Sequence, residues 1–349
     1  MRKRAAARKR SLRAVKAMPE LRQDPITRRW VIIAPGRAER PWHIGSPASP
    51  PSAETCPFCA GNEAMTPPEV WADREAGTKA DAPGWRLRIV SNKYPALTSG
   101  DEPIAERDDF YRSMNAVGVH EVVIESPDHV TDMSTLGAPQ IAEILRAYRA
   151  RLRILGSDPR WRYLMIYKNQ GERAGATLAH IHSQLTALPA VPKHAQDEIN
   201  GASAHFAATG QCIYCEIAGR ELAGGERLVA ENERFVALCP FAPRFGYETW
   251  LLPKDHAANF AASSDSDIAA FGQILRHLLF KLARRFADPP FNYVIHSAPE
   301  NTVESLSYHW HLEILPQLTR AAGFEWGSGM HMNSVAPEDA ARLLRDTPV

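Results

Sequence analysis

The sequence predicts a protein of mixed strands and helices in which two similar halves follow one another. Short apolar runs with β-branched or alternating residues indicate strands, and each half carries one long apolar stripe at helical spacing. Cysteines and histidines also recur in the same order in both halves, which is the mark of an internal duplication. The 349 residues suffice for one large domain or two ordinary ones, and a hydrophobic content of 44% is typical of a globular core.

In the first half, the apolar runs predict strands at residues 30–33, 87–90, 120–124, 162–168 and 181–186. A helix is predicted over residues 139–155, because apolar residues such as Ile141, Leu145 and Tyr148 fall on one face. The segment 41–55 is rich in proline and serine, so we expect it to form a loop.

The second half repeats this order. Strands are predicted at residues 235–238, 249–252, 293–296 and 310–315, and a helix over residues 266–286. Each half therefore runs from a C-x-x-C pair through strands and one helix to a final hairpin. We expect a tail at residues 1–18, a first half over 19–195 and a second half over 196–349, with the junction of the duplication near residues 189–203.

The bulk composition gives no strong attraction to polyanions, since the formal net charge is only +1. No apolar run approaches the roughly 20 residues needed to span a bilayer, so we expect a soluble, cytoplasmic protein that binds neither membrane nor nucleic acid. Residues 1–18 are locally basic and contain no acid. They would fit a nucleic-acid-binding arm or a targeting peptide, but a disordered solubilising tail is the favoured interpretation.

The cysteines are not distributed like a disulfide framework. Four of them form two C-x-x-C pairs, while Cys239 stands alone in an apolar run and is expected to be a core residue. Without a secretory signal, such pairs are typical of metal sites or redox dithiols. Matching histidines in each half favour metal, because zinc takes four thiolate or imidazole ligands and a redox pair needs no histidine.

Two closed, structural metal sites are therefore predicted. The first would use Cys56, Cys59, His129 and His180. The second would use Cys212, Cys215, His256 and His309. Glu198 and His296 remain alternative ligands for the second site.

The chemistry is expected on the strand that follows His180. Alternate residues of a strand share one face, so His180, His182 and Gln184 point the same way. A neutral imidazole at His182 is a suitable nucleophile toward phosphorus, and the amide of Gln184 can donate to a phosphoryl oxygen. The preceding segment 171–177 is expected to bring backbone N–H groups close to phosphates. A lone strand histidine is more often a surface or core residue, but the pairing with His180 and Gln184 favours catalysis.

These motifs resemble the galactose-1-phosphate uridylyltransferase family, the transferase branch of the histidine-triad superfamily. The resemblance rests on His180-x-His182-x-Gln184, on Cys-Pro-Phe-Cys, on Ser-Pro-Asp-His and on the duplicated layout, and it covers about residues 21 to 344. It implies an α+β fold of two histidine-triad-like halves, each with an antiparallel sheet flanked by helices. It also implies a homodimer whose subunits complete one another's active sites.

The resemblance further implies a role for several residues. His182 would be the nucleophile, Gln184 its phosphoryl partner, and two zinc ions would occupy the metal sites, with zinc or iron in the second. The positions that would contact the sugar nucleotide and its phosphates are Arg37, Arg40, Asn92, Tyr167, Asn169, Thr177 and Gln184. The expected reaction converts UDP-glucose and galactose 1-phosphate into glucose 1-phosphate and UDP-galactose through uridylyl-His182.

The sequence departs from the family pattern at three places. The nucleophile motif is His-Ile-His-Ser-Gln, where His-Pro-His-Gly-Gln is more usual, and the second metal site contains a cysteine pair. Ser328 stands near the place of a tyrosine that contacts the hexose in the family. The alternatives are therefore an ADP-glucose phosphorylase that uses His182 with phosphate as acceptor, a histidine-triad hydrolase, and a non-catalytic zinc scaffold or nucleic-acid-binding protein.

Overall fold

A computed structural model describes residues 20–27, 30–33, 53–97, 99–100, 102–103, 105–107, 112–114, 116–299 and 306–349. The basic tail, Arg37, Arg40 and most of the proline-rich segment fall outside these residues. The predictions made for them therefore stay predictions.

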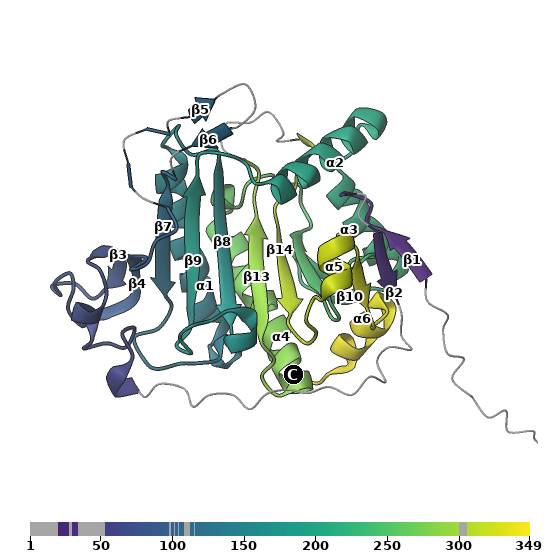
Figure 1. Ribbon diagram of the computed structural model, residues 1–349. Coiled ribbons are helices and arrows are strands. Elements are labelled where there is room, and N and C mark those ends of the chain that lie inside the picture. Colours follow the sequence, from purple (N-terminus) through teal and green to yellow (C-terminus); the bar gives the residue numbers. More distant parts are fainter. Residues whose placement is uncertain are drawn as a thin grey trace, which may run out of the picture.

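The two halves share one ten-stranded antiparallel sheet (Figure 1). The first half supplies β3 (Glu69–Arg74), β4 (Trp85–Ser91), β7 (Val119–Ile124), β9 (His182–Leu188) and β8 (Tyr163–Gln170). The second half supplies, in the equivalent order, β10 (Leu228–Glu231), β11 (Phe235–Leu238), β12 (Thr249–Pro253), β14 (His311–Pro316) and β13 (Phe291–His296). The halves meet in the middle, where β8 and β13 pair antiparallel with Asn169 opposite Asn292.

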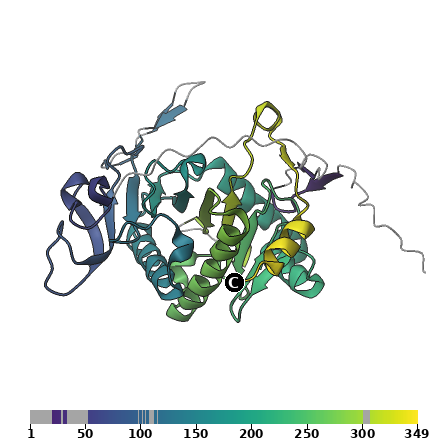
Figure 2. The same ribbon diagram turned by 90° about the horizontal axis from the view of Figure 1, so that it is seen from below.

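One face of this sheet is covered by α1 (Ala138–Gly156) and α4 (Asp265–Phe286), which lie side by side (Figure 2). Both helices bury an apolar stripe against the sheet, as their sequence spacing predicted. The first turn of α4 is fixed by a capping box, in which Ser264 and Asp267 satisfy each other's backbone N–H groups. On β9, Ser183 and Leu185 face this helical layer, so His182 and Gln184 face the opposite side.

Several elements were not predicted. The helices α2 (Lys193–Thr209) and α3 (Ile213–Gly224) follow β9, so the segment expected to be the junction is mostly helical and the second half has more than one helix. The alanine-rich sequence of α2 has only a weak apolar stripe, which is why periodicity missed it. Gly201 is required there, because a Cβ would lie 1.9 Å from the carbonyl oxygen of Ile26.

The remaining elements lie at the edges. A small sheet joins β1 (Glu20–Gln23), β2 (Trp30–Ile33) and β15 (His331–Asn333), and β5 (Ala105–Arg107) pairs with β6 (Arg112–Met114). The C-terminal helices are α5 (Gly323–Ser328) and α6 (Pro337–Asp346). Among the described residues, none of the helices has the length and apolar character needed to cross a bilayer.

All predicted strands and both predicted helices are present, so the α+β class with an antiparallel sheet and flanking helices is confirmed. The structure adds that the two sheets are joined edge to edge. The boundary between the halves at residues 195 and 196 stays a prediction.

Candidate active site and metal centres

His182 is the first residue of β9, and its ring is held in one tautomer. Its Nδ1 lies 2.8 Å from the carbonyl oxygen of His180. A carbonyl can only accept, so Nδ1 carries the proton and Nε2 keeps its lone pair. The ring is 8% exposed, and burial lowers its pKa below the usual value. His182 is therefore a neutral imidazole whose free nitrogen is nucleophilic at neutral pH.

The ring of His182 also contacts the first C-x-x-C turn. Phe58 lies edge-on to it, with 5.2 Å between the ring centroids. Phe58 packs in turn against a small apolar cluster on the same face of the sheet, formed by Trp85, Val90, Val122 and Ile124. The His182 ring is thus packed on one side by a residue of the turn that carries Cys56 and Cys59.

Gln184 is fixed by three side chains that converge on its Oε1. His120 Nε2 lies 2.8 Å from that oxygen, the hydroxyl of Tyr167 lies 3.0 Å from it, and Asn92 Nδ2 lies 3.4 Å from it. The structure therefore brings the predicted residues Asn92, Tyr167 and Gln184 together on one side of the sheet. The fourth member, His120, was not among the predicted site residues.

A buried polar network supports the strand from behind. Lys168 forms an ion pair with Glu125 and donates to the carbonyl oxygen of His182 at 3.0 Å. Tyr148 of α1 lies 2.6 Å from both Glu125 and Ser183. Burial lowers the pKa of Lys168, although the Glu125 carboxylate opposes this shift. The network fixes the backbone of the strand segment that carries His182.

The first predicted metal site is assembled by the fold. The ligand atoms of Cys56, Cys59, His129 and His180 all lie within 4.8 Å of one another. Sulfur-to-Nδ1 distances are 3.6 Å for Cys56 with His180, 3.2 Å for Cys59 with His129 and 3.5 Å for Cys59 with His180. A tetrahedral zinc ion with ordinary bond lengths separates sulfur and nitrogen by about 3.5 Å, so the four donors fit zinc.

The surrounding residues orient these ligands. His180 presents Nδ1 to the sulfurs, while its Nε2 donates to the carbonyl oxygen of Ser126 at 2.9 Å. Burial lowers the pKa of His180 to about 4, so it is neutral and able to bind a cation. Burial and the neighbouring sulfur of Cys56 raise the pKa of the Cys59 thiol to about 11. A bound cation is what would make two adjacent thiolates stable here.

The second predicted metal site is also assembled, but it is more open. The ligand atoms of Cys212, Cys215, His256 and His309 lie within 4.8 Å of one another. Cys212 caps the first turn of α3 and Cys215 lies inside it, so this pair is held by a helix start. Cys215 Sγ lies 3.4 Å from His256 Nδ1 and 3.3 Å from His309 Nδ1. His256 is exposed, whereas every ligand of the first site is buried or half-buried.

Glu198 and His296 do not belong to that site, contrary to the alternative left open by the sequence. They form a separate buried cluster with His311 and Glu313, which are the second-half counterparts of His182 and Gln184. His296 lies 3.1 Å from Glu198 and 3.5 Å from Glu313, and its ring stacks on His311. Burial opposes its protonation, but the carboxylates of Glu198 and Glu313 raise the pKa of His296 to about 10.

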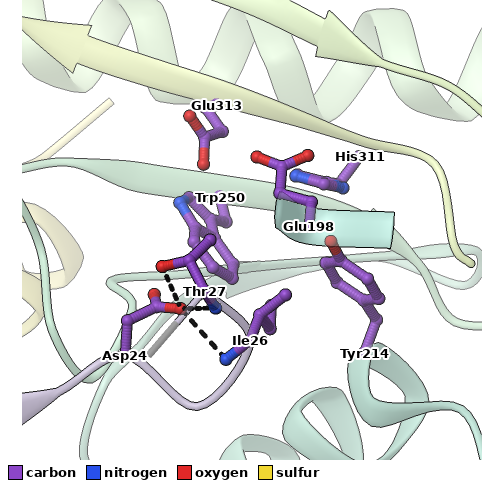
Figure 3. A pocket seen from close by; sticks show the side chains of 8 residues that line it. All are labelled: Asp24, Ile26, Thr27, Glu198, Tyr214, Trp250, His311 and Glu313. Atoms are coloured by element: carbon purple, nitrogen blue, oxygen red, sulfur yellow. Dashed lines mark hydrogen bonds between the residues drawn. The ribbon is translucent and has the colours of Figure 1, made fainter. Parts of the chain in front are cut away.

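Figure 3 shows how His311 and Glu313 are enclosed. The turn formed by Asp24, Ile26 and Thr27 lies beneath Glu313 and His311 and closes the small cavity beside them. Asp24 fixes this turn by accepting from the backbone N–H groups of Ile26 and Thr27 at 3.0 and 2.7 Å. The His311 ring is 1% exposed, and Arg244 forms an ion pair with Glu313. Of the two equivalent histidines, His311 is therefore the more enclosed, and His182 keeps the larger exposed fraction.

Asn169 and Thr177 are two further positions predicted to contact the nucleotide, and neither is among the three side chains that converge on Gln184. Asn169 accepts from Asn292 Nδ2 at 2.7 Å, so it ties the two halves together, and Thr177 is exposed in the turn that follows. The expectation that segment 171–177 offers its backbone N–H groups to phosphates is wrong for three of these groups. Its N–H groups at residues 174, 175 and 176 donate to carbonyl oxygens of the same turn, so they are not free donors.

Comparisons with known proteins agree with this geometry. Sequence models of the N-terminal and C-terminal domains of galactose-1-phosphate uridyl transferase match residues 10–192 and 198–345. The chain is 39% identical to an ADP-glucose phosphorylase of Arabidopsis thaliana, over 94% of this chain and 93% of that protein. It is 31% identical to a galactose-1-phosphate uridylyltransferase of Thermotoga maritima, over 95% and 99% of the two chains. The crystal structure of an Arabidopsis ADP-glucose phosphorylase with bound ADP-glucose superposes with a TM-score of 0.81 and 36% identity, covering 95% of this chain and all of that one.

Proposed function

Because this chain belongs to the galactose-1-phosphate uridyl transferase family of nucleotidyltransferases, we propose that His182 carries an adenylyl group from ADP-glucose to inorganic phosphate. In the first step, Nε2 of His182 attacks the α-phosphorus and the bond to glucose 1-phosphate breaks, which leaves adenylyl-His182. In the second step, a phosphate oxygen attacks the same phosphorus, the P–N bond breaks and ADP is released. The observation that carries the proposal is the fixed tautomer of His182, which leaves Nε2 free to act as a nucleophile. Gln184 lies two residues further along the same strand, on the same face.

The choice of substrates rests on two observations. The plant ADP-glucose phosphorylase is more similar to this chain, at 39% identity, than the Thermotoga uridylyltransferase, at 31%. Ser328 also stands near the place where the family has a hexose-contacting tyrosine, and its hydroxyl donates to the carbonyl oxygen of Phe324. A site without that tyrosine is better suited to phosphate than to a second hexose phosphate.

Uridylyl transfer from UDP-glucose to galactose 1-phosphate is the second candidate. It was the expected reaction from the family resemblance, and it is supported by the Thermotoga relative, which the chain matches over nearly its whole length. Both candidates form a nucleotidyl adduct on His182 and differ in the base of that adduct and in the acceptor.

The remaining residues take supporting roles in the proposal. Gln184 donates from its amide nitrogen to the α-phosphoryl oxygen, where charge builds up. Asn92 and Tyr167 hold Gln184. Arg37, Arg40, Asn169 and Thr177 are the further residues that we propose to contact the nucleotide and its phosphates. We further propose a homodimer in which the subunits complete one another's active sites.

We propose that zinc occupies the first metal site, with zinc or iron in the second. Both donor sets supply four protein ligands, so neither leaves a position for substrate and each metal serves to fix the fold. In the first site, that fixed fold is the strand that carries His182.

The test combines donors and acceptors. ADP-glucose and UDP-glucose, each labelled in the α-phosphate, are mixed with enzyme alone, and then with phosphate or galactose 1-phosphate. We expect a labelled enzyme in the first stage and, in the second, turnover of ADP-glucose with phosphate at least about tenfold above the uridylyl reaction. The reverse order would support uridylyl transfer, and release of free nucleotide to water without an acceptor would indicate a hydrolase.

A further inference from the structure

We infer that His120 is a positioning residue that turns the amide nitrogen of Gln184 toward the phosphoryl group. The inference deepens the proposed function and rests on it. It assigns a role to a histidine that touches no reacting atom and acts only through Gln184.

The first step of the argument concerns the tautomer of His120. The backbone N–H of Ala96 donates to Nδ1 of His120 at 3.1 Å. A backbone N–H can only donate, so Nδ1 is the acceptor and Nε2 carries the proton of the ring. The nitrogen that faces Gln184 at 2.8 Å is therefore a donor.

The second step concerns Asn92, which faces the same point. Its Oδ1 accepts from the backbone N–H of Tyr94 at 2.9 Å, so its Nδ2 is turned toward Gln184. That nitrogen also lies 3.1 Å from His120 Nε2, and since both are donors, the acceptor they share is Oε1 of Gln184. The backbone N–H of Asn92 donates to the carbonyl oxygen of His120 at 2.8 Å, which holds this turn against β7. The backbone N–H groups of residues 94 and 96 thus occupy the acceptor atoms of Asn92 and His120. Both side chains are therefore left with donor groups facing Gln184.

The third step concerns Gln184 itself. An amide has one accepting end and one donating end, and a donor cannot face other donors without cost. With Nε2 of His120, Nδ2 of Asn92 and the hydroxyl of Tyr167 all aimed at it, the accepting end of Gln184 must face this group. Its NH₂ group is then left to point toward the strand face shared with His182, where the α-phosphoryl oxygen would be.

His120 is the strongest of the three donors by distance. It is also the one that a strand presents rigidly, since His120 lies on β7 and pairs with Thr186, two residues beyond Gln184 on β9. Without this donor, the Gln184 amide can rotate, and either end can face the phosphate. The loss would appear in the rate of nucleotidyl transfer rather than in the affinity for the sugar nucleotide.

A double-mutant cycle tests this inference, with single-turnover formation of the labelled His182 adduct as the readout. We expect His120→Ala to slow adduct formation by about 10- to 100-fold, the range seen when a group that orients a functional side chain is lost. In a Gln184→Ala background, the same change should cost less than about twofold, because the group that it positions is already absent. His120→Gln, which keeps a donor near the Nε2 position, should recover most of the rate, whereas His120→Asn should not.

The controls separate positioning from a structural role. His277→Ala, a histidine change on α4, should leave the rate unchanged, and all variants should keep their metal content and their affinity for ADP-glucose. Equal losses from His120→Ala in both backgrounds, or an unchanged rate in the wild-type background, would overturn the inference while leaving the proposed function intact. A wild-type enzyme that forms no adduct would instead show that the proposed function is wrong, and the inference with it.

Discussion

Phe58 lies between the two cysteines of the first C-x-x-C pair and contacts the ring of His182 edge-on at 5.2 Å. Because Cys56 and Cys59 flank Phe58 in the sequence, the turn that carries two candidate metal ligands also places this ring against His182. If His182 is the nucleophile that we propose, this contact links it to the first candidate metal site.

Phe58→Ala should slow adduct formation by about tenfold or more, since small misplacements of a reacting group are costly. The four metal ligands are untouched, so metal content should be unchanged. Single-turnover labelling together with metal analysis checks this. Phe58→Tyr, which keeps the ring, is the matched control and should retain most of the rate. Equal rates for the alanine variant and the wild type would show that the contact is incidental.

Loss of a cysteine should have unequal effects in the two metal centres. Cys59→Ser removes a ligand beside His182 and should abolish adduct formation together with one bound metal ion. Cys215→Ser should also lose one metal ion. Its site is more exposed and lies in the second half, whose histidine His311 is enclosed, so most of the adduct-forming rate should remain. Metal content and labelling are measured on the same samples. Similar loss of labelling in both variants would contradict the separate roles.

Gln184→Glu should reduce adduct formation by about 100- to 1,000-fold, as expected when a donor to a developing charge is removed. The new carboxylate would also repel the phosphate. The second half already carries this change, since Glu313 occupies the equivalent position and is neutralised by Arg244 and His296. Gln184→Ala is the control and should be less impaired than the glutamate variant. Full activity of Gln184→Glu would exclude the proposed role of the amide.

The buried ion-pair cluster predicts that stability depends on pH. His296 has a pKa of about 10 in the folded protein, against about 6.5 in an unfolded chain. The protonated ring stabilises the fold fully at pH values below the pKa of the unfolded chain. This contribution to the free energy of unfolding is lost as the pH rises from about 6.5 toward 10. Urea unfolding should therefore show the free energy of unfolding falling from pH 7 to pH 9.5. His296→Gln should be less stable at pH 7 and show a flatter pH dependence. Parallel curves for the two proteins would mean that His296 is neutral in the fold.

The sequence predicted the parts of the site that depend on local rules. Strand alternation alone places His182 and Gln184 on one face, and the matching Cys and His pairs identify both metal sites. The joining of the halves through Asn169 and Asn292 could not be predicted, because the pairing of two edge strands has no local signature. His120 was missed because a single histidine on a strand does not by itself indicate a function. Its role as a donor to Gln184 depends on the hydrogen bond from Ala96, which forms only in the folded chain.

The error in the 171–177 segment has a similar cause. Glycines at 171 and 175 do adopt positive φ angles, as a tight turn requires, but the N–H groups of that turn satisfy its own carbonyl oxygens. The pattern of glycines predicts a turn. Whether a turn leaves its donors free depends on hydrogen bonds that only the folded chain reveals.

The most direct test of the account compares His182→Asn with His311→Asn, the same change at the two duplicated positions. Both rings use Nδ1 toward the carbonyl oxygen two residues earlier, at 2.8 and 3.1 Å, so the two changes are closely matched. After mixing with α-phosphate-labelled ADP-glucose, the wild type and His311→Asn should retain a labelled peptide that contains residue 182, and His182→Asn should retain none. Label on His182→Asn, or loss of label only in His311→Asn, would contradict the claim that His182 is the group that carries the nucleotide.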